Sequence, residues 1–147
     1  MGEIQFQGVY FTLKGRKFLP ILNKMIFSFE KLEAWQEAKG LVKHIYLLSE
    51  SLPTRERFGL IDQMRRAATS ITSNLAEGSG RITPRDKSHF YAMAYSSLLE
   101  LLNHVIITSD LGYINTSQMN ESRDRIEKVS RIINGLRKSQ QPKHLTL

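Results

Sequence analysis

Apolar residues recur at alternating steps of four and three positions in three separate segments of the chain after Phe29. This spacing puts side chains on one face of an α-helix, which turns once in about 3.6 residues. The first stripe is Ala34, Ala38, Leu41, Ile45, Leu48 and Leu52. The second is Ile61, Met64, Ala68, Ile71 and Leu75, and the last is Met119, Ser122, Ile126, Val129, Ile133 and Leu136. The pattern predicts long amphipathic helices that share one core.

Residues with helix-start and helix-stop preferences separate these segments. Pro53 ends the first helix, because the residue before a proline is pushed out of helical geometry, and Thr54 is expected to cap the second. Gly78 and Gly80 are expected to end the second helix in left-handed geometry. The third begins at Thr83–Pro84, with Asp86 completing a capping box, and stops at Gly112. Asn115 to Gln118 opens the fourth helix.

The second and third helices carry more than one ordered face. On the third, Phe90, Ala94 and Leu101 lie on one face, Tyr91, Leu98 and Ile106 on another, and His89, Met93, Ser96, Glu100 and Asn103 on a third. A helix with little purely solvated surface is usually enclosed on several sides. One bundle core in a chain of 147 residues does not supply that enclosure. We therefore expect the chain to assemble with copies of itself.

A second stripe on the second helix consists of small or polar residues and ends at an acid. Glu77 on the second helix and Glu100 on the third need partners if they are buried, because breaking a buried ion pair costs roughly 3–5 kcal/mol. Arg65 and Arg66 of the second helix are the natural candidates. We therefore predict a structural polar network of Gln63, Arg66, Ser70, Asn74, Glu77 and Glu100.

These patterns predict an all-α protein, an antiparallel up-down-up-down four-helix bundle, because short connections force neighbouring helices to run in opposite directions. The bundle is expected over residues 29–138, with a flexible tail at 139–147. Residues 1–28 show no helical period. They are interpreted as a poorly ordered basic extension; a translated leader before a start at Met25 and a short strand pair are the alternatives.

Composition indicates a cellular compartment and a class of binding partner. The chain has no cysteine, which is typical of a reducing compartment, so a cytoplasmic location is expected. No uninterrupted apolar run approaches the roughly 20 residues of a membrane span, so no membrane partner is expected. The net charge is +7, of which +3 lies in residues 1–29. This excess favours anionic partners such as nucleic acid.

No motif for catalysis, metal or cofactor binding accompanies the helices. The stretch "EGSGR" lacks the Gly-Lys-Ser/Thr ending of a phosphate loop and follows no strand, so it is interpreted as a helix stop. His44, His89, His104 and His144 form no metal-ligand spacing. Glu77 and Glu100 stand alone as possible acid and base. We expect no enzyme activity, no cofactor, no metal and no small-molecule substrate.

Two classes of function remain open. The first is a nucleic-acid-binding protein that contacts phosphates rather than bases, because no base-reading motif is present. The second is a structural or protein-interaction scaffold without a nucleic-acid role. The possible nucleic-acid contacts are Arg65, Arg81, Arg85, Lys87, Arg123, Arg125, Lys128 and Arg131.

Three stretches resemble a known bacterial family. "FEKLEAWQEAKGLVKHIYLLSESLP", "FGLIDQMRRAATSITSNLAEGSGR" and "SSLLELLNHVIITSDLGYI" are similar to 23S rRNA intervening-sequence proteins, over about residues 29–136. The matching residues are Gln63, Arg65, Arg66, Ala67, Ser70, Asn74, Glu77, Gly78 and Arg81, with Ser97 and Glu100 on the third helix.

The resemblance implies a four-helix bundle that assembles as a ring-like homopentamer. Many members of this family are encoded within insertions in ribosomal RNA genes, which does not make them ribosomal components. A related branch assists the reverse transcriptases of diversity-generating retroelements and binds nucleic acid. The biochemical activity of the family itself is not settled.

Overall fold

The computed structural model describes residues 5–7, 10–13, 16–18 and 26–141. Four helices make up most of the second part: α1 (Glu33–Glu50), α2 (Leu60–Ser79), α3 (Pro84–Asp110) and α4 (Thr116–Ser139). Short 3-10 helices η1 (Ser28–Lys31) and η2 (Thr54–Glu56) precede α1 and α2. The prediction of a four-helix, bundle-like fold is confirmed for residues 26–141.

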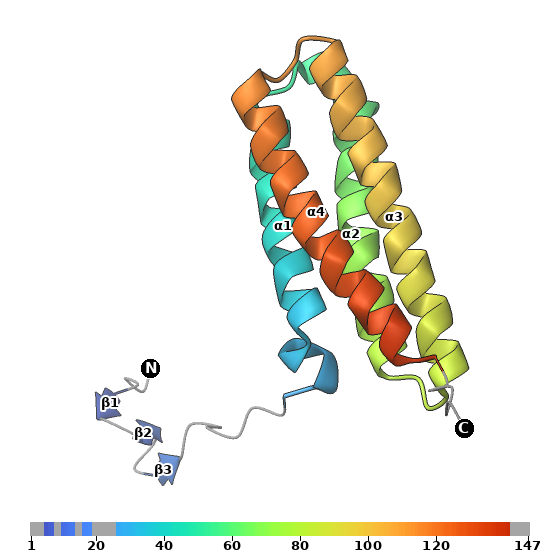
Figure 1. The fold of residues 1–147 in the computed structure, drawn as a ribbon. Helices are drawn as coiled ribbons and strands as arrows, with labels where there is room; N and C mark the ends of the chain where they lie inside the picture. Colours follow the sequence, from blue (N-terminus) through green and yellow to red (C-terminus); the bar gives the residue numbers. More distant parts are fainter. Residues whose placement is uncertain (1–4, 8–9, 14–15, 19–25, 142–147) are drawn as a thin grey trace, which may run out of the picture.

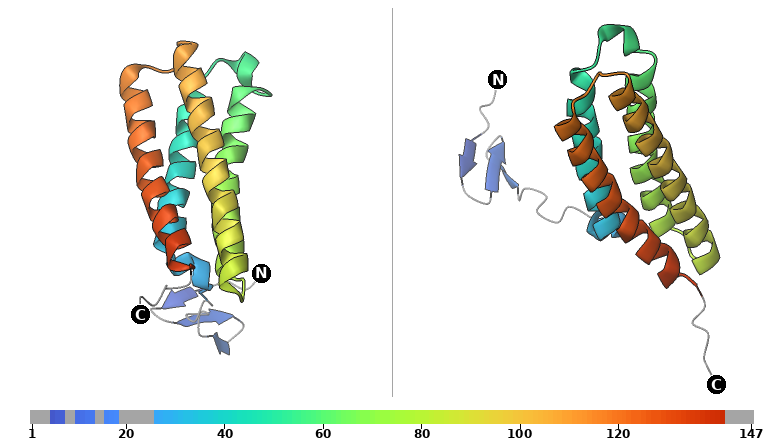
Figure 2. Two further views of the ribbon diagram at one scale, coloured as in Figure 1. Left: turned by 45° about the vertical axis from the view of Figure 1, so that its right-hand side comes forward. Right: turned by 45° about the horizontal axis from the view of Figure 1, so that its top comes forward.

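The helices form a ring of neighbours: α1 packs on α2, α2 on α3, α3 on α4, and α4 on α1. Figure 1 shows α1 and α3 leading away from the end that carries the C-terminus, while α2 and α4 lead back to it. Both further views place the α2–α3 turn and the end of α4 together at that end (Figure 2). We call this end the bundle base and define it as residues 26–34, 77–89 and 131–141.

The core consists largely of the predicted stripes. All six residues of the first stripe are buried, as are Met64, Ala68, Ile71 and Leu75 of the second. In the fourth helix Ser122, Ile126, Val129 and Ile133 are buried. Helix α3 contributes Tyr91, Ala94, Leu98, Leu101 and Val105, which come from two of its three predicted faces.

Two predicted helix starts are confirmed. The Thr83 hydroxyl accepts a hydrogen bond from the Asp86 amide at 3.1 Å, and Pro84 occupies the first turn of α3. At α4, Asn115 and Gln118 form a reciprocal capping box with two bonds of 2.9 Å. Gly112, with φ of 73°, ends α3 as expected.

The prediction that Thr54 caps the second helix is wrong. Residues Thr54–Glu56 form η2, and α2 begins at Leu60 after Gly59. A contact with the α3–α4 turn holds this segment. Arg55 donates to the Tyr113 hydroxyl at 3.1 Å, and that hydroxyl donates to Glu56 Oε1 at 3.2 Å.

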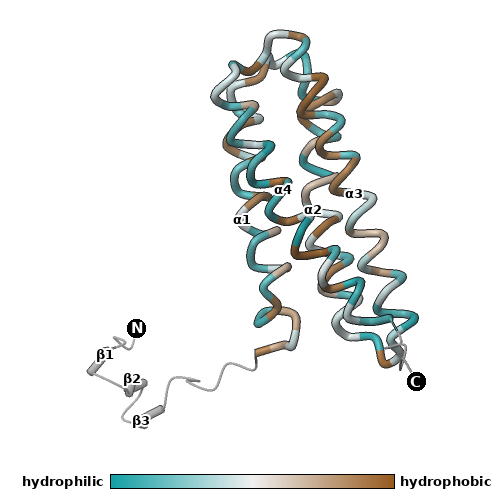
Figure 3. The backbone as a smooth tube through the Cα atoms, viewed as in Figure 1, coloured by the Kyte–Doolittle hydropathy of each residue, from teal (hydrophilic) through white to brown (hydrophobic). Residues whose placement is uncertain are grey.

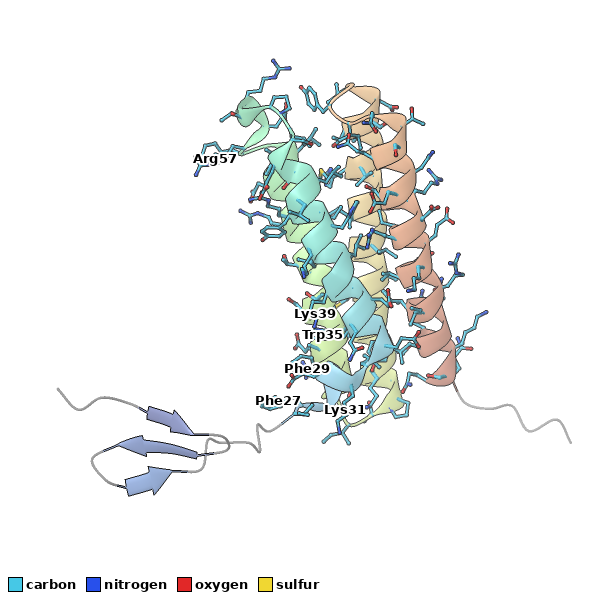
Figure 4. The ribbon with its side chains drawn as sticks, turned by 90° about the vertical axis from the view of Figure 1, so that its left-hand side faces the viewer. Phe27, Phe29, Lys31, Trp35, Lys39 and Arg57 are labelled. Carbon is cyan, nitrogen blue, oxygen red and sulfur yellow. The ribbon has the colours of Figure 1, made fainter. Side chains whose placement is uncertain are left out.

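An aromatic cluster lies where η1 leads into α1 (Figure 4). The ring of Phe29 meets Trp35 edge-on at 5.0 Å, and Phe27 stacks on Phe29 at 6.1 Å. The ammonium group of Lys39 lies 4.9 Å from the Trp35 ring. The cluster secures the entry into α1, while Arg57 of the η2 connection lies near the opposite end of the bundle.

Residues near the N-terminus contain strand, which the all-α prediction omitted. Strands β1 (Gln5–Gln7), β2 (Tyr10–Leu13) and β3 (Arg16–Phe18) form an antiparallel sheet in the order β1-β2-β3. Phe6 pairs with Phe11, and Thr12 pairs with Lys17. Sequence analysis favoured an extension without regular structure and kept a strand pair as an alternative. The prediction of a flexible tail over residues 139–147 falls mostly outside the described residues.

Candidate functional site

A chain of hydrogen bonds links α2 to α3 at the centre of the predicted polar network. Asn74 Nδ2 donates to Ser70 Oγ at 3.2 Å and to the Ser70 carbonyl at 2.9 Å. Ser70 Oγ lies 2.8 Å from Ser97 Oγ, and Ser97 donates to the Met93 carbonyl at 3.1 Å. The hydroxyl of Ser70 therefore donates to Ser97. Each donor in the chain has an acceptor, which lets these polar groups lie between packed helices.

The other predicted members of the network do not join it within one chain. Arg66 pairs with Asp62 at 2.8 Å, one turn earlier on α2, and Glu77 pairs with Arg81, one turn later. Glu100 lies 3.7 Å from His104 Nε2, and Gln63 is exposed. Arg66 and Glu77 are eleven positions apart on one helix, about 16 Å along its axis, too far for contact. Nearer partners of opposite charge neutralise both side chains.

Gly78 is needed for close packing rather than for a left-handed turn. A Cβ atom at Gly78 would lie 2.7 Å from Tyr91 Cε1 and 2.9 Å from Phe90 Cβ. Among the described glycines, Gly112 is the one with positive φ. The expectation that Gly78 and Gly80 adopt left-handed geometry is therefore wrong: Gly78 lies within α2 and Gly80 is a right-handed C-cap.

The outer α2–α3 face carries most of the polar residues for which the sequence predicted enclosure, together with Arg66 and Ile107. We define it as Gln63, Arg66, Ser70, Asn74 and Glu77 on α2 with Met93, Ser96, Glu100, Asn103 and Ile107 on α3. In the single chain Met93 is 41% exposed and Ile107 is 38% exposed. His104, between them along α3, has a buried Nδ1 with no hydrogen-bond partner among residues 26–141. This face thus has exposed apolar side chains and, beside them, one unsatisfied polar atom.

Helix α3 is also the most apolar of the four. Among the described helices it alone is long and apolar enough, by length and composition, to cross a bilayer, a criterion that core helices of soluble proteins also meet. Only 28% of its apolar window is buried within one chain. Figure 3 shows apolar residues recurring along α3 toward its junction with α4. The single chain therefore leaves much of this helix uncovered.

Most predicted nucleic-acid contacts already have partners. Arg65 is partly buried, donates to Ser49 Oγ at 2.8 Å and covers the Tyr46 ring at 4.6 Å, so it holds α2 against α1. On α4, Arg125 pairs with Glu121 at 2.9 Å. Arg123 pairs with Glu127 at 3.4 Å, and Lys128 pairs with Glu37 of α1 at 2.9 Å.

The remaining predicted contacts lie on or near the bundle base. Arg81 pairs with Glu77 and covers the Phe90 ring at 4.3 Å. Lys87 donates to the Ser79 carbonyl at 3.3 Å. Arg85 and Arg131 are exposed and have no ion-pair partner within residues 26–141. The predicted contacts that are exposed and have no ion-pair partner thus both belong to the bundle base.

Sequence analysis missed a serine–histidine–glutamate arrangement between α1 and α4. His44 Nε2 lies 2.8 Å from Ser122 Oγ, and His44 Nδ1 lies 3.5 Å from Glu121. Ser122 is fully buried, and its hydroxyl donates to the Gln118 carbonyl at 2.7 Å. A nucleophile needs a free approach and a base to take its proton. Here the serine accepts from His44, so the arrangement joins two helices.

Burial lowers the pKa of His44; the carboxylate of Glu121 opposes this effect, and Arg125 adds to it. The folded protein therefore binds a proton at His44 less readily than the unfolded chain does. The contribution of neutral His44 to stability is present above the unfolded pKa and is lost as the pH falls through the folded pKa.

We expect the melting temperature to fall between about pH 7 and 5. His44→Gln, which keeps a donor for Ser122, is expected to reduce this slope. His89→Gln, at an exposed position, is the control, and an equal slope in both variants would contradict the assignment.

The described residues contain no group of three or more metal-ligating side chains. The "EGSGR" stretch comprises the end of α2 and the start of the α2–α3 turn. Glu77 and Glu100 lie one turn from Arg81 and His104 respectively, and neither contacts the other. The candidate functional features of the described residues are therefore two surfaces, the outer α2–α3 face and the basic bundle base.

Comparison with known proteins agrees with this architecture. A search of curated proteins finds no match. Among solved structures, a protein of unknown function from the S23 ribosomal protein family of Bacteroides thetaiotaomicron is similar, with a TM-score of 0.67 at 17% identity. The similarity covers 71% of this chain and 95% of that one, and at this identity it shows the fold. The model of the 23S rRNA-intervening sequence protein family matches residues 30–135, so the chain belongs to this family.

Proposed function

We propose that the protein is a non-enzymatic, cytoplasmic bundle that assembles with copies of itself and binds RNA or DNA through its phosphates. The fold in this proposal is the antiparallel up-down-up-down bundle. The observation that carries the assembly is the outer α2–α3 face, where exposed Met93 and Ile107 flank the unsatisfied Nδ1 of His104. A neighbouring copy that covered Met93 and Ile107 would remove their apolar surface from water.

We propose a ring of five copies, as the resemblance to intervening-sequence proteins implies. A closed ring with cyclic symmetry repeats the same surface around one axis. Every copy then presents its bundle base at the same level along that axis, so any positive potential there is multiplied. The net charge of +7 per chain favours an anionic polymer over a small neutral ligand.

A scaffold without a nucleic-acid role is the second candidate. The ion pairs on α4 favour it, because Arg123, Arg125 and Lys128 each lie within 3.4 Å of a carboxylate. Paired charges contribute less long-range potential than isolated ones. Salt dependence separates the two candidates.

Light scattering on the purified protein, with RNA retention measured in the same buffers, tests both parts of the proposal. We expect a mass near 85 kDa, five copies of the 16.9 kDa chain. We also expect retention of single-stranded RNA that falls steeply between about 50 and 200 mM salt, because binding releases counterions from phosphates. A monomeric mass would contradict the assembly. Absence of RNA binding even at low salt would leave the scaffold role.

A further inference from the structure

The net charge of the described bundle lies at one end. The bundle base contains seven lysines and arginines and four acids, whereas the rest of residues 26–141 contains nine of each. All of the net charge of +3 in this region therefore belongs to the base. Sequence analysis distributed the possible contacts over α2, α3 and the length of α4. The fold brings the unbalanced cations together, because α2 ends, α3 begins and α4 ends at this base.

A groove crosses the base between the start of α3 and the end of α4. It has a volume of about 670 Å³ and is lined by Arg85, Ser88 and His89 on one side and by Gln140 and Gln141 on the other. An adjoining recess shares Ser88 and Gln141 and adds the residues Asn134, Arg137 and Lys138. The first depression is also lined by Pro84 and Ala92, and together the two form a track with positive charge on both helices.

The cations of this track differ from those on the side of α4. Arg85 and Lys138 are exposed and have no carboxylate partner within residues 26–141. Arg137 lies 5.2 Å from the Tyr95 ring and donates to Asn134, contacts that restrict its side chain and leave its charge uncompensated. By contrast, Arg123 and Lys128 each have a carboxylate. Charge that is not already neutralised is what attracts phosphates.

We propose that a nucleic-acid backbone lies in the groove at the bundle base, with Arg85 and Lys138 as phosphate contacts, and that the α4 side does not touch it. This inference rests on the proposed nucleic-acid binding and assigns its site. The groove is open and its cations are spread along it, which suits successive phosphates of a polymer rather than one small anion. Ser88 and the amides of Gln140 and Gln141 supply further polar groups for phosphate or sugar oxygens.

Two charge-matched variants of the full chain test the assignment by fluorescence anisotropy, with a short fluorescein-labelled single-stranded RNA at several salt concentrations. One variant carries Arg85→Gln and Lys138→Gln, and the other carries Arg123→Gln and Lys128→Gln. Both remove two positive charges from exposed positions, so net charge is matched, and thermal melts check that both variants stay folded. We expect the first to weaken binding roughly tenfold and to reduce the salt slope by about 1.4, at about 0.7 per lost contact. The second is expected to stay near wild type.

The outcomes separate this inference from the function on which it rests. Equal weakening by the two variants would mean that overall charge matters and the groove does not, which overturns the inference while RNA binding stands. Weakening by the α4 variant alone would move the contact to α4 and also overturn it. Absence of binding by the wild type would remove the proposed function and the inference together.

Discussion

Replacing Gly78 by alanine is expected to destabilise the bundle, although the same replacement at Gly135 is expected to stabilise it. Both glycines lie within helices, where alanine is favoured by roughly 1 kcal/mol. At Gly78 the new Cβ would lie 2.7 Å from a ring atom of Tyr91 and 2.9 Å from Phe90 Cβ. Neither atom is the free end of a flexible side chain, so α2 and α3 must separate. At Gly135 no heavy atom beyond the adjacent residues and the local helix backbone lies within 4 Å of the added group.

Overpacking of this kind typically costs about 1–3 kcal/mol. The gain in helix propensity is common to both variants, so we expect them to differ by roughly 1–3 kcal/mol in unfolding free energy, with Gly78→Ala the less stable. Urea denaturation followed by circular dichroism measures this difference at matched protein concentration. A stabilised Gly78→Ala variant would show that the contact between α2 and α3 is looser than its geometry indicates.

The parts of the fold that the sequence predicted depend on local chemistry. The stripe from Ala34 to Leu52 is buried because an amphipathic helix removes its apolar face from water by packing that face against the core. The caps at Thr83 and Asn115 form because their side chains reach amides three residues away. Such interactions join residues within one or two helical turns, so they can be predicted from a single sequence.

The start of α2 shows where this logic fails. Thr54 has the side chain of a helix cap, yet α2 begins at Leu60. The preceding segment is held by the Tyr113 hydroxyl, which lies 57 positions from Glu56 in the sequence. The start of α2 thus depends on a contact between the η2 connection and the α3–α4 turn. Helix propensity does not predict such a tertiary contact.

Within one chain only part of the predicted polar network is hydrogen-bonded together, for a related reason. Ser70 and Asn74 form a chain of hydrogen bonds with Ser97, which the predicted network did not include. The charged members were assigned to one another on the assumption that they are buried together. In the single chain Arg66 and Glu77 are each neutralised by a neighbour four positions away. Pairs four positions apart on one helix are neighbours on its surface, so they need no tertiary arrangement.

Arginine substitution on the outer α2–α3 face is expected to dissociate the proposed assembly. Met93 and Ile107 are 41% and 38% exposed in the single chain. They lie two heptads apart along α3, on either side of Glu100. A neighbouring copy on this face would cover both. Burying an arginine without a partner there costs several kcal/mol per charge, more than a modest apolar contact supplies. The double variant Met93→Arg and Ile107→Arg should therefore scatter light as a chain of 16.9 kDa.

Leu99→Arg is the matched control for this variant. Leu99 is 50% exposed on the same helix but lies one turn beyond Tyr95, whose ring faces Arg137 of α4. It therefore lies on the flank of α3 that turns toward α4, and the mass of this variant should equal that of the wild type. Thermal melts should show that both variants stay folded, because all three side chains are exposed in one chain. If Leu99→Arg dissociates the assembly and the double variant does not, copies meet through α3 and α4, and the unsatisfied His104 has no part in the contact.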